Sequence, residues 1–189
     1  MRRVYLIRHG LTEGNRLRRY IGRTDEPLCA AGRAALSAAP LKGIETVYVS
    51  PLLRARETAA ILFPHARQIV VDDLREMDFG AFENRSADDM KNDAAYRAWV
   101  DGLCEGDCPG GENRRGFVAR TVRAFENICA AGGDAPLVIV AHGGTVMALM
   151  SELGEPKKDY WAWHVGAGGC LRCALDGGRL LYEGDGFDA

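Results

Sequence analysis

The sequence predicts an α/β fold, a three-layer αβα sandwich with a mainly parallel central sheet. Apolar, strand-like runs alternate with helix-like segments along the chain, which is the pattern of such folds. The clearest runs, at residues 4–7 and 136–141, are short and bounded by polar or glycine residues, as buried strands are. A length of 189 residues with 47% hydrophobic content suits a full core, so we expect one domain over 1–189.

The first predicted strand ends in Arg8, His9 and Gly10. Charged side chains are seldom buried without a partner, and ligands of open α/β sheets lie at the carboxyl ends of the strands. One interpretation is that Arg8 and His9 form the floor of an anion-handling site. The other is that Arg8 pairs with a surface carboxylate while His9 caps a loop, and these residues alone do not decide between the two.

Helix and strand signals mark the remaining elements. Alanine favours helices and Pro40 would end one, while Ser50 as N-cap and Pro51 at the first position would begin another. Apolar residues every four positions predict a long amphipathic helix near residue 120. In chain order we expect a loop at 11–25, a helix at 30–39, a strand at 45–49, a helix from 50 to about 62, a strand at 68–71, a loop at 74–80, a helix at 86–101, a loop at 102–111, a helix at 112–131, a strand at 136–141, a helix at 145–153 and a hairpin of strands at 168–175 and 179–183.

Arg54 is expected at the same edge of the sheet as the first histidine. It lies in the first turn of its predicted helix, where side chains slant back toward the end of the preceding strand. A surface position is the alternative for any single helical arginine. A carboxylate from Glu76 or Asp78, in the loop at 74–80, can reach this edge as well.

The strand at 136–141 repeats the pattern of the opening strand. It ends in His142, Gly143 and Gly144, which lead into a predicted helix. Backbone N–H groups that open a helix form a natural seat for an anion. The histidine directly in front of them strengthens what would be a weak phosphate signal.

These residue types together have the chemistry of phosphoryl transfer. Two arginines can hold a phosphoryl group, one neutral imidazole can attack phosphorus, and a carboxylic acid can protonate the departing alkoxide. This chemistry needs no metal and no other cofactor. A zinc site from His9 and His142 is the competing interpretation, but the arginines would oppose the ion and no third ligand appears at helix spacing.

The motifs and their order resemble the histidine phosphatase (phosphoglycerate mutase-like) superfamily. The resemblance rests on the blocks at residues 8–15, 22–28 with Gly32, 50–59, 74–80 and 141–143. It implies a phosphoglycerate mutase-like fold and a phosphohistidine intermediate. It also implies that this single histidine phosphatase domain carries a cap-like insertion around 84–112.

The resemblance implies a role for each matching residue. His9 is similar to the phosphorylated nucleophile, and Glu76 matches the proton donor ahead of Asp78. His65 and His164 match no catalytic position and are expected to be incidental. The remaining implied contacts are Arg8, Arg54 and His142 in the phosphate pocket, Asn15 and the Gly143 amide assisting them, and Gly22 with Arg23 in a loop that touches substrate.

Residues 76–83 and 109–112 resemble the alpha-ribazole phosphatases and related small phosphatases. The chain departs from that branch at Phe82, Asn84 and Asn113, where Trp, Gly and Ser are common. We expect a phosphomonoester hydrolase for a small phosphorylated metabolite, with alpha-ribazole 5'-phosphate as one candidate. A phosphoglycerate mutase is the main alternative, although 84–111 leaves little room for the segment that such mutases carry over the site. The second alternative is a phosphate-binding module without turnover.

Charge and composition exclude several classes of partner. The net charge of −2 favours neither nucleic acid nor an acidic membrane, and no apolar run approaches the roughly 18 residues of a membrane span. Arg8 ends the first apolar run too early for a signal peptide, so we expect a cytoplasmic protein, and the six scattered cysteines predict no disulfides. The basic segment 1–23 suits a small anionic substrate. Monomer and homodimer stay open.

Overall fold

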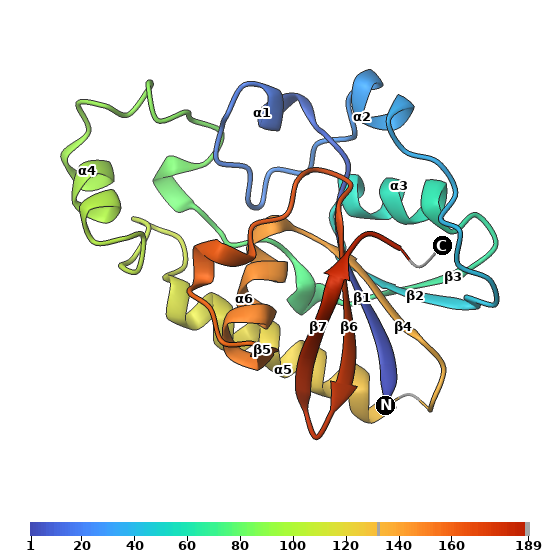
Figure 1. Cartoon of the computed structure of the whole chain (residues 1–189). Coiled ribbons are helices and arrows are strands. Elements are labelled where there is room, and N and C mark those ends of the chain that lie inside the picture. Colours follow the sequence, from blue (N-terminus) through green and yellow to red (C-terminus); the bar gives the residue numbers. More distant parts are fainter. Residues whose placement is uncertain (132, 188–189) are drawn as a thin grey trace.

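The computed structural model describes residues 1–131 and 133–187. Over these residues the central sheet has seven strands in the order β3-β2-β4-β1-β6-β7-β5 (Figure 1). The strands are β1 (Arg2–Arg8), β2 (Thr46–Val49), β3 (Arg67–Val70), β4 (Leu137–Ala141), β5 (Gly154–Glu155), β6 (Cys170–Asp176) and β7 (Arg179–Asp185).

The sheet is mainly parallel, as predicted. Strands β3, β2, β4 and β1 run parallel to their neighbours, whereas β6 joins β1 and β7 in antiparallel pairs. The register places Arg8 of β1 beside Ala141 of β4. Because both strands end there, the residues that follow them, His9 and His142, leave the sheet at the same edge.

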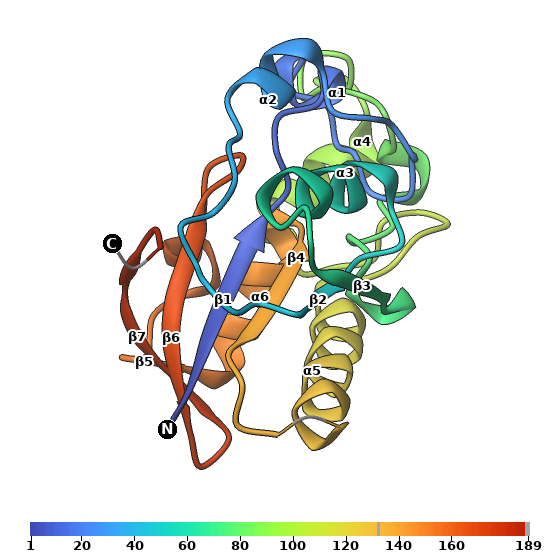
Figure 2. The same cartoon turned by 90° about the vertical axis from the view of Figure 1, so that its right-hand side faces the viewer.

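Helices cover both faces of the sheet and complete the three predicted layers. Alternate residues of β1 point to opposite sides, with Leu6 in one core cluster and Ile7 in the other. The first cluster contains side chains of α5 and α6, and the second contains side chains of α3 (Figure 2). The helices are α1 (Glu13–Arg16), α2 (Ala30–Ala34), α3 (Leu53–Leu62), α4 (Ala94–Asp101), α5 (Arg114–Ala131) and α6 (Gly143–Leu153), with short 3-10 turns η1 (Asp72–Leu74), η2 (Gly80–Phe82) and η3 (Tyr160–Trp163).

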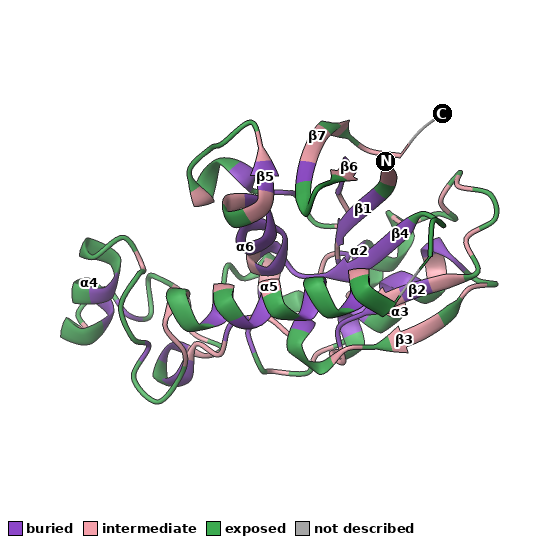
Figure 3. Cartoon of the chain, turned by 90° about the horizontal axis from the view of Figure 1, so that it is seen from below, coloured by how far each residue is buried: buried purple, intermediate pink, exposed green. Residues whose placement is uncertain are grey.

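The strands that carry the two histidines are the most deeply buried part of the sheet. All five residues of β4 and the middle four of β1 are buried (Figure 3). By contrast, α4 lies at one end of the molecule, apart from the sheet (Figures 1 and 3). None of the helices in the described residues has the length and apolar content needed to cross a membrane.

Several predicted boundaries were wrong. The helix expected at 30–39 ends at Ala34, and the one expected at 86–101 begins only at Ala94, where the Asp93 carboxylate caps its first amides. Ser50 is not an N-cap, because α3 begins at Leu53. The last helix begins earlier than expected, directly after His142.

Candidate active site

His9 is buried at the end of β1, with 4% of its surface exposed. Its amide donates to the Ala141 carbonyl at 2.9 Å, which ties the residue to β4. Its Nδ1 lies 2.7 Å from the Gly10 carbonyl oxygen. A carbonyl can only accept a hydrogen bond, so Nδ1 carries the proton and Nε2 keeps its lone pair.

His142 faces His9 across a short gap. The two ring centroids are 5.2 Å apart and the rings meet edge to face at 64°. The His142 ring is fully buried, and its Nε2 lies 2.7 Å from Ser50 Oγ at the end of β2. The hydroxyl that was expected to cap a helix therefore orients the second imidazole instead.

Two arginines flank the imidazoles. Arg54 is fully buried, and it donates to the carbonyl oxygens of Thr24 at 2.7 Å and Gly22 at 2.9 Å. Arg8 donates to the Val165 carbonyl at 2.7 Å. The Nε atoms of both arginines and Nδ1 of His142 are buried without a hydrogen-bond partner among the described residues.

This unused hydrogen-bonding capacity indicates a ligand. Buried polar atoms are nearly always paired in folded proteins, and here two unpaired donors belong to cations. The Oδ1 of Asn15, at α1, is also buried without a partner, but it is an acceptor and so does not itself point to an anion. The arrangement is that of a site whose remaining partner is a small oxyanion.

Of the two candidate carboxylates, Glu76 lines the cavity with His9 and Asp78 does not. The Glu76 carboxylate accepts hydrogen bonds from the amides of Met77 at 2.9 Å and Gly144 at 3.0 Å, and it lines the cavity beside His9. The Asp78 carboxylate accepts from the Gly80 amide and lies 3.5 Å from an exposed Arg23. The amide of Gly144, which was expected to help seat an anion, is thus taken by Glu76.

The protonation of these groups follows from burial. Burial and the nearby charges of Arg54 and Arg8 lower the pKa of His9 to about 3, against a smaller opposing effect of the Gly10 carbonyl. Burial also holds the pKa of His142 well below its usual value. Burial raises the pKa of Glu76, although two amides and the two arginines act against it. The site therefore combines neutral imidazoles with a carboxyl that retains its proton more readily than usual.

The cavity above these residues has a volume of about 200 Å³. Its polar lining includes Arg8, His9, Asn15, Glu76 and Gly143. Aromatic side chains from four segments also line it. These are Tyr20, Phe79, Trp99, Tyr160 and Trp161.

Two further arginines besides Arg8 line the cavity. Arg114 is paired with Glu105 and lies 5.0 Å from the centroid of the Tyr160 ring. Arg19 is exposed, and it donates to the Asn84 carboxamide at 3.3 Å. A larger hollow of about 820 Å³ lies along α5 and contains neither histidine.

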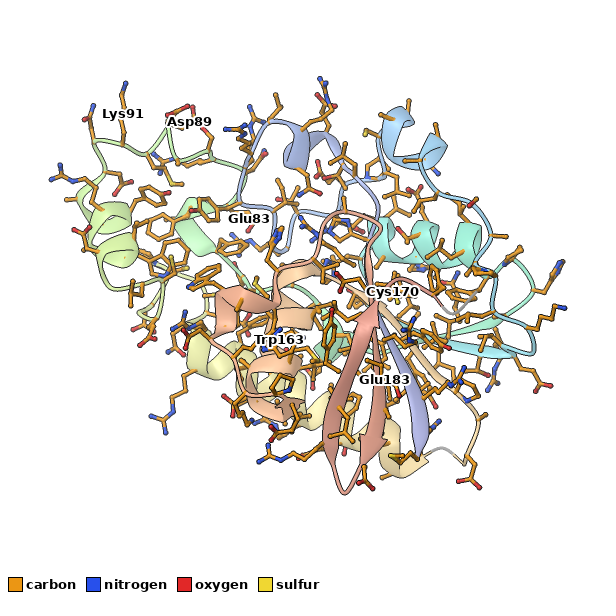
Figure 4. All side chains as sticks on the ribbon, viewed as in Figure 1. Glu83, Asp89, Lys91, Trp163, Cys170 and Glu183 are labelled. Atoms are coloured by element: carbon orange, nitrogen blue, oxygen red, sulfur yellow. The ribbon has the colours of Figure 1, made fainter. Side chains whose placement is uncertain are left out.

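Gly22 and Arg23, which were expected to touch substrate, do not line the cavity. Gly22 supports the site from behind, because its carbonyl accepts from Arg54 and its amide donates to Glu83 (labelled in Figure 4). A Cβ atom there would lie 2.0 Å from the Met77 carbonyl oxygen. Arg23 is exposed and turned toward Asp78, and it does not line the cavity.

The structure also places His164 in the cavity wall. His164 was expected to be incidental, but it lines the cavity, and its Nε2 lies 3.3 Å from Arg8 Nη1. Trp163, its neighbour (labelled in Figure 4), is buried in the core against Tyr182. The aromatic cluster at residues 160–164 suggested either a rim or a core position for His164, and the sequence could not give its contact with Arg8, which joins residues 156 positions apart.

The site offers no evident place for a metal ion. Within 1–131 and 133–187, no three His, Cys, Asp or Glu side chains lie close enough together to hold one. The two histidines instead share their surroundings with arginines. Cationic donors, neutral imidazoles and a carboxyl of raised pKa are groups that suit phosphoryl transfer through a histidine.

Comparison with known proteins gives consistent matches over nearly the whole chain. The family model of the histidine phosphatase superfamily (branch 1) matches residues 4–183. A protein of Serratia proteamaculans named as a probable phosphoglycerate mutase is 36% identical over 82% of this chain and 77% of its own. A Hydrogenobacter thermophilus protein named as a candidate phosphoserine phosphatase is 31% identical over 96% of this chain and 95% of its own. The crystal structure of the alpha-ribazole phosphatase from Shigella flexneri is similar with a TM-score of 0.83 and 25% identity, covering 96% of this chain and 94% of that one.

Proposed function

Because this chain belongs to branch 1 of the histidine phosphatase superfamily, we propose that it is a phosphomonoester hydrolase that works without a metal, through a phosphohistidine at His9. The observation that carries the proposal is the state of His9. Its Nδ1 is committed to the Gly10 carbonyl, so the lone pair of Nε2 is free for attack on phosphorus. Its lowered pKa keeps the ring neutral at physiological pH.

In the first step, His9 Nε2 forms a bond to phosphorus while the bond from phosphorus to the ester oxygen breaks. The Glu76 carboxyl gives its proton to that departing oxygen, and the alcohol leaves. In the second step, a water oxygen attacks the phosphohistidine and Glu76 takes the proton of the water. The bond to Nε2 then breaks, which releases inorganic phosphate and restores both groups.

The remaining polar groups hold the transferred phosphoryl group. Arg8 and Arg54 supply positive charge and unpaired Nε donors on its oxygens. His142, which its lowered pKa keeps neutral, contributes hydrogen bonding to the phosphoryl group. Asn15 and the Gly143 amide, at the N-terminus of α6, assist it. No metal or other cofactor enters either step.

We propose that the segment 84–112 forms a cap that selects the leaving group. Its α4 contributes Trp99 to the cavity wall, where Tyr20 and Phe79 pack against that ring. Aromatic walls favour flat, apolar groups. A phosphate ester with an aromatic body, such as alpha-ribazole 5'-phosphate, is therefore the favoured substrate class, in agreement with the name of the Shigella flexneri neighbour.

A phosphoglycerate mutase or phosphoserine phosphatase activity is the second candidate. The names of the Serratia and Hydrogenobacter relatives favour it, and their substrates carry a carboxylate beside the phosphate. Arg19 lines the cavity and makes no ion pair within hydrogen-bond distance of a carboxylate in the described residues, although its charge also acts on Asp89, so it would receive that group. A non-catalytic phosphate-binding module is disfavoured, because nucleophile, cations and acid are all together.

The proposal is tested by hydrolysis of p-nitrophenyl phosphate in excess chelator. We expect turnover by the wild-type protein and none above background by His9→Ala. Equal turnover by the two proteins would reject the role of His9. A parallel assay of 3-phosphoglycerate with a bisphosphoglycerate primer separates the two activities, since a mutase would yield the isomer and a phosphatase free phosphate.

A further inference from the structure

We propose that Arg120, together with Glu112, is the positioning pair that holds Glu76 at the departing oxygen. This inference rests on the proposed function, because it concerns the proton donor of that reaction. Neither residue lines the cavity, and the sequence analysis assigned no role to either. Both act on the backbone of the loop that carries Glu76.

The loop 73–76 has no regular partner for its carbonyl groups, and side chains supply them. Arg120 donates to the carbonyl oxygens of Asp73 at 2.8 Å, Arg75 at 3.1 Å and Glu76 at 3.4 Å. The hydroxyl of Thr145, on α6, donates to the Leu74 carbonyl at 3.2 Å. Four consecutive carbonyls are thus bound by two side chains, three of them by one guanidinium.

Glu112 completes the guanidinium's set of partners. Its two carboxylate oxygens accept from Arg120 Nε at 3.0 Å and Nη2 at 2.8 Å, in a bidentate pair. The oxygen that accepts from Nη2 also accepts from the Asp78 amide at 3.0 Å, and the Glu112 amide donates to the Asp78 carbonyl at 2.9 Å. Glu112 therefore fixes the far side of the same loop.

Arg120 is 6% exposed and its position is set by α5. That helix packs against η1, directly before the loop, and the guanidinium lies 5.1 Å from the centroid of the buried Phe117 ring. A rigid helix thus reaches three points of an irregular loop through one planar group with five donors. Lysine keeps the charge but cannot make this set of bonds.

The arrangement explains how Glu76 keeps its place near two arginines. Its carboxyl is held by the Gly144 and Met77 amides, while its backbone is held by Arg120. A general acid works only within hydrogen-bond reach of the oxygen it protonates. Loosening the loop would move the Glu76 carboxyl away from that oxygen. The position of His9 would not change, because His9 is held at the end of β1 and not by this loop.

The test compares two substrates of similar shape whose leaving groups differ. Phenyl phosphate needs protonation of its leaving oxygen, whereas p-nitrophenyl phosphate needs little. We compare kcat/KM, which reports the phosphorylation step alone, because Glu76 also serves the water step that both substrates share. In Arg120→Lys and in Glu112→Gln we expect kcat/KM for phenyl phosphate to fall about 10- to 100-fold, with that for p-nitrophenyl phosphate within about 3-fold of wild type. Arg123→Lys, an exposed arginine on the same helix, is the matched control and should leave both rates unchanged.

Combination with Glu76→Gln gives the sharper result. If Arg120 acts through Glu76, adding Arg120→Lys to Glu76→Gln lowers the rate on phenyl phosphate no further. A further loss as large as in the wild-type background would overturn the inference. An equal loss on both substrates in the single variants would also overturn it, because that result marks a merely structural role. Wild-type rates on both substrates would overturn it as well.

Failure of the proposed function would look different. In that case wild-type protein quenched during turnover would carry no phosphate on His9, whatever the leaving group. If Arg120→Lys does not fold, Glu112→Gln alone decides by the same comparison of substrates.

Discussion

At the scale of single residues, the site depends on two groups held in unusual protonation states. His9 is neutral because its burial and two arginines oppose a proton, and burial raises the pKa of the Glu76 carboxyl above its usual value. The same arginines lower both pKa values, since positive charge favours the neutral imidazole and the ionised carboxylate. Burial outweighs them at Glu76, which is why it can serve as an acid.

These states predict a pH dependence that differs between substrates. Neutral His9 persists until the pH falls toward about 3, so its protonation does not limit activity near neutrality. The pKa of Glu76 is raised, and as the pH rises through it the carboxyl loses the proton it must donate. We expect kcat/KM for phenyl phosphate to fall on the alkaline side, relative to that for p-nitrophenyl phosphate.

The measurement is the ratio of the two kcat/KM values across pH, which cancels the ionisation of the phosphate shared by both substrates. Glu76→Gln should remove the alkaline fall in the ratio and lower kcat for phenyl phosphate about 100-fold. A ratio independent of pH in the wild-type protein would exclude Glu76 as the donor.

Gly144 predicts a second selective loss. A Cβ atom at this position would lie 2.2 Å from Glu76 Oε1, so Gly144→Ala must displace the carboxyl. We expect a loss of about 10-fold or more on phenyl phosphate and little change on p-nitrophenyl phosphate. Gly106→Ala is the control, because a Cβ atom there meets nothing within 4 Å. Equal rates for Gly144→Ala and Gly106→Ala on phenyl phosphate would contradict the assigned contact.

At the scale of elements, the two histidine-bearing strands and the residues at their carboxyl ends could be predicted, but the strand order and several helix boundaries could not. Buried strands are short and apolar, so β1 and β4 were evident, and each delivers a histidine to the same edge. Ser50 and Pro51 have the sequence signature of a helix start. Tertiary contact overrode it, because the serine hydroxyl bonds to His142 and the helix begins three residues later.

The cap segment predicts how the substrate is chosen. Trp99→Leu removes an aromatic wall and should lower kcat/KM for aryl phosphates about 10-fold, while Trp99→Phe should retain most of the wild-type kcat/KM.

Arg19→Gln should leave kcat/KM for aryl phosphates unchanged and lower it only for substrates that carry a carboxylate. Assays on an aryl phosphate, 3-phosphoglycerate and phosphoserine check both. A loss on aryl phosphates in Arg19→Gln, with none in Trp99→Leu, would reverse the substrate assignment.

At the scale of the whole molecule, the site exists because distant segments meet. Residues 8 and 9, 54, 76 and 142 to 144 come together at one edge of one sheet. Their types and order were readable from the sequence. Arg120 and His164 were not, because a buried guanidinium or a ring on a cavity wall leaves no local pattern.

The contacts of the charged residues explain part of the uneven distribution of charge along the chain, with arginines concentrated in 1–23 and acids in 72–112. The arginines of the first segment include Arg8 and Arg19, both on the cavity wall. Several acids of 72–112 serve structural ends, among them Glu83 at the Gly22 and Thr24 amides and Glu112 at Arg120. Two arginines of the segment 1–23 therefore line the cavity, while Glu83 and Glu112 hold the loops around it.

The central claim is that His9 becomes phosphorylated during turnover. Wild-type protein mixed with excess p-nitrophenyl phosphate, quenched in alkali and digested should yield a phosphate that survives alkali but not acid. Peptide mass spectrometry should locate it on the segment containing His9, at up to one phosphate per chain, and Glu76→Gln should retain it. A phosphate on another residue, or turnover at the full rate with His9 unmodified at every quench time, would contradict the account.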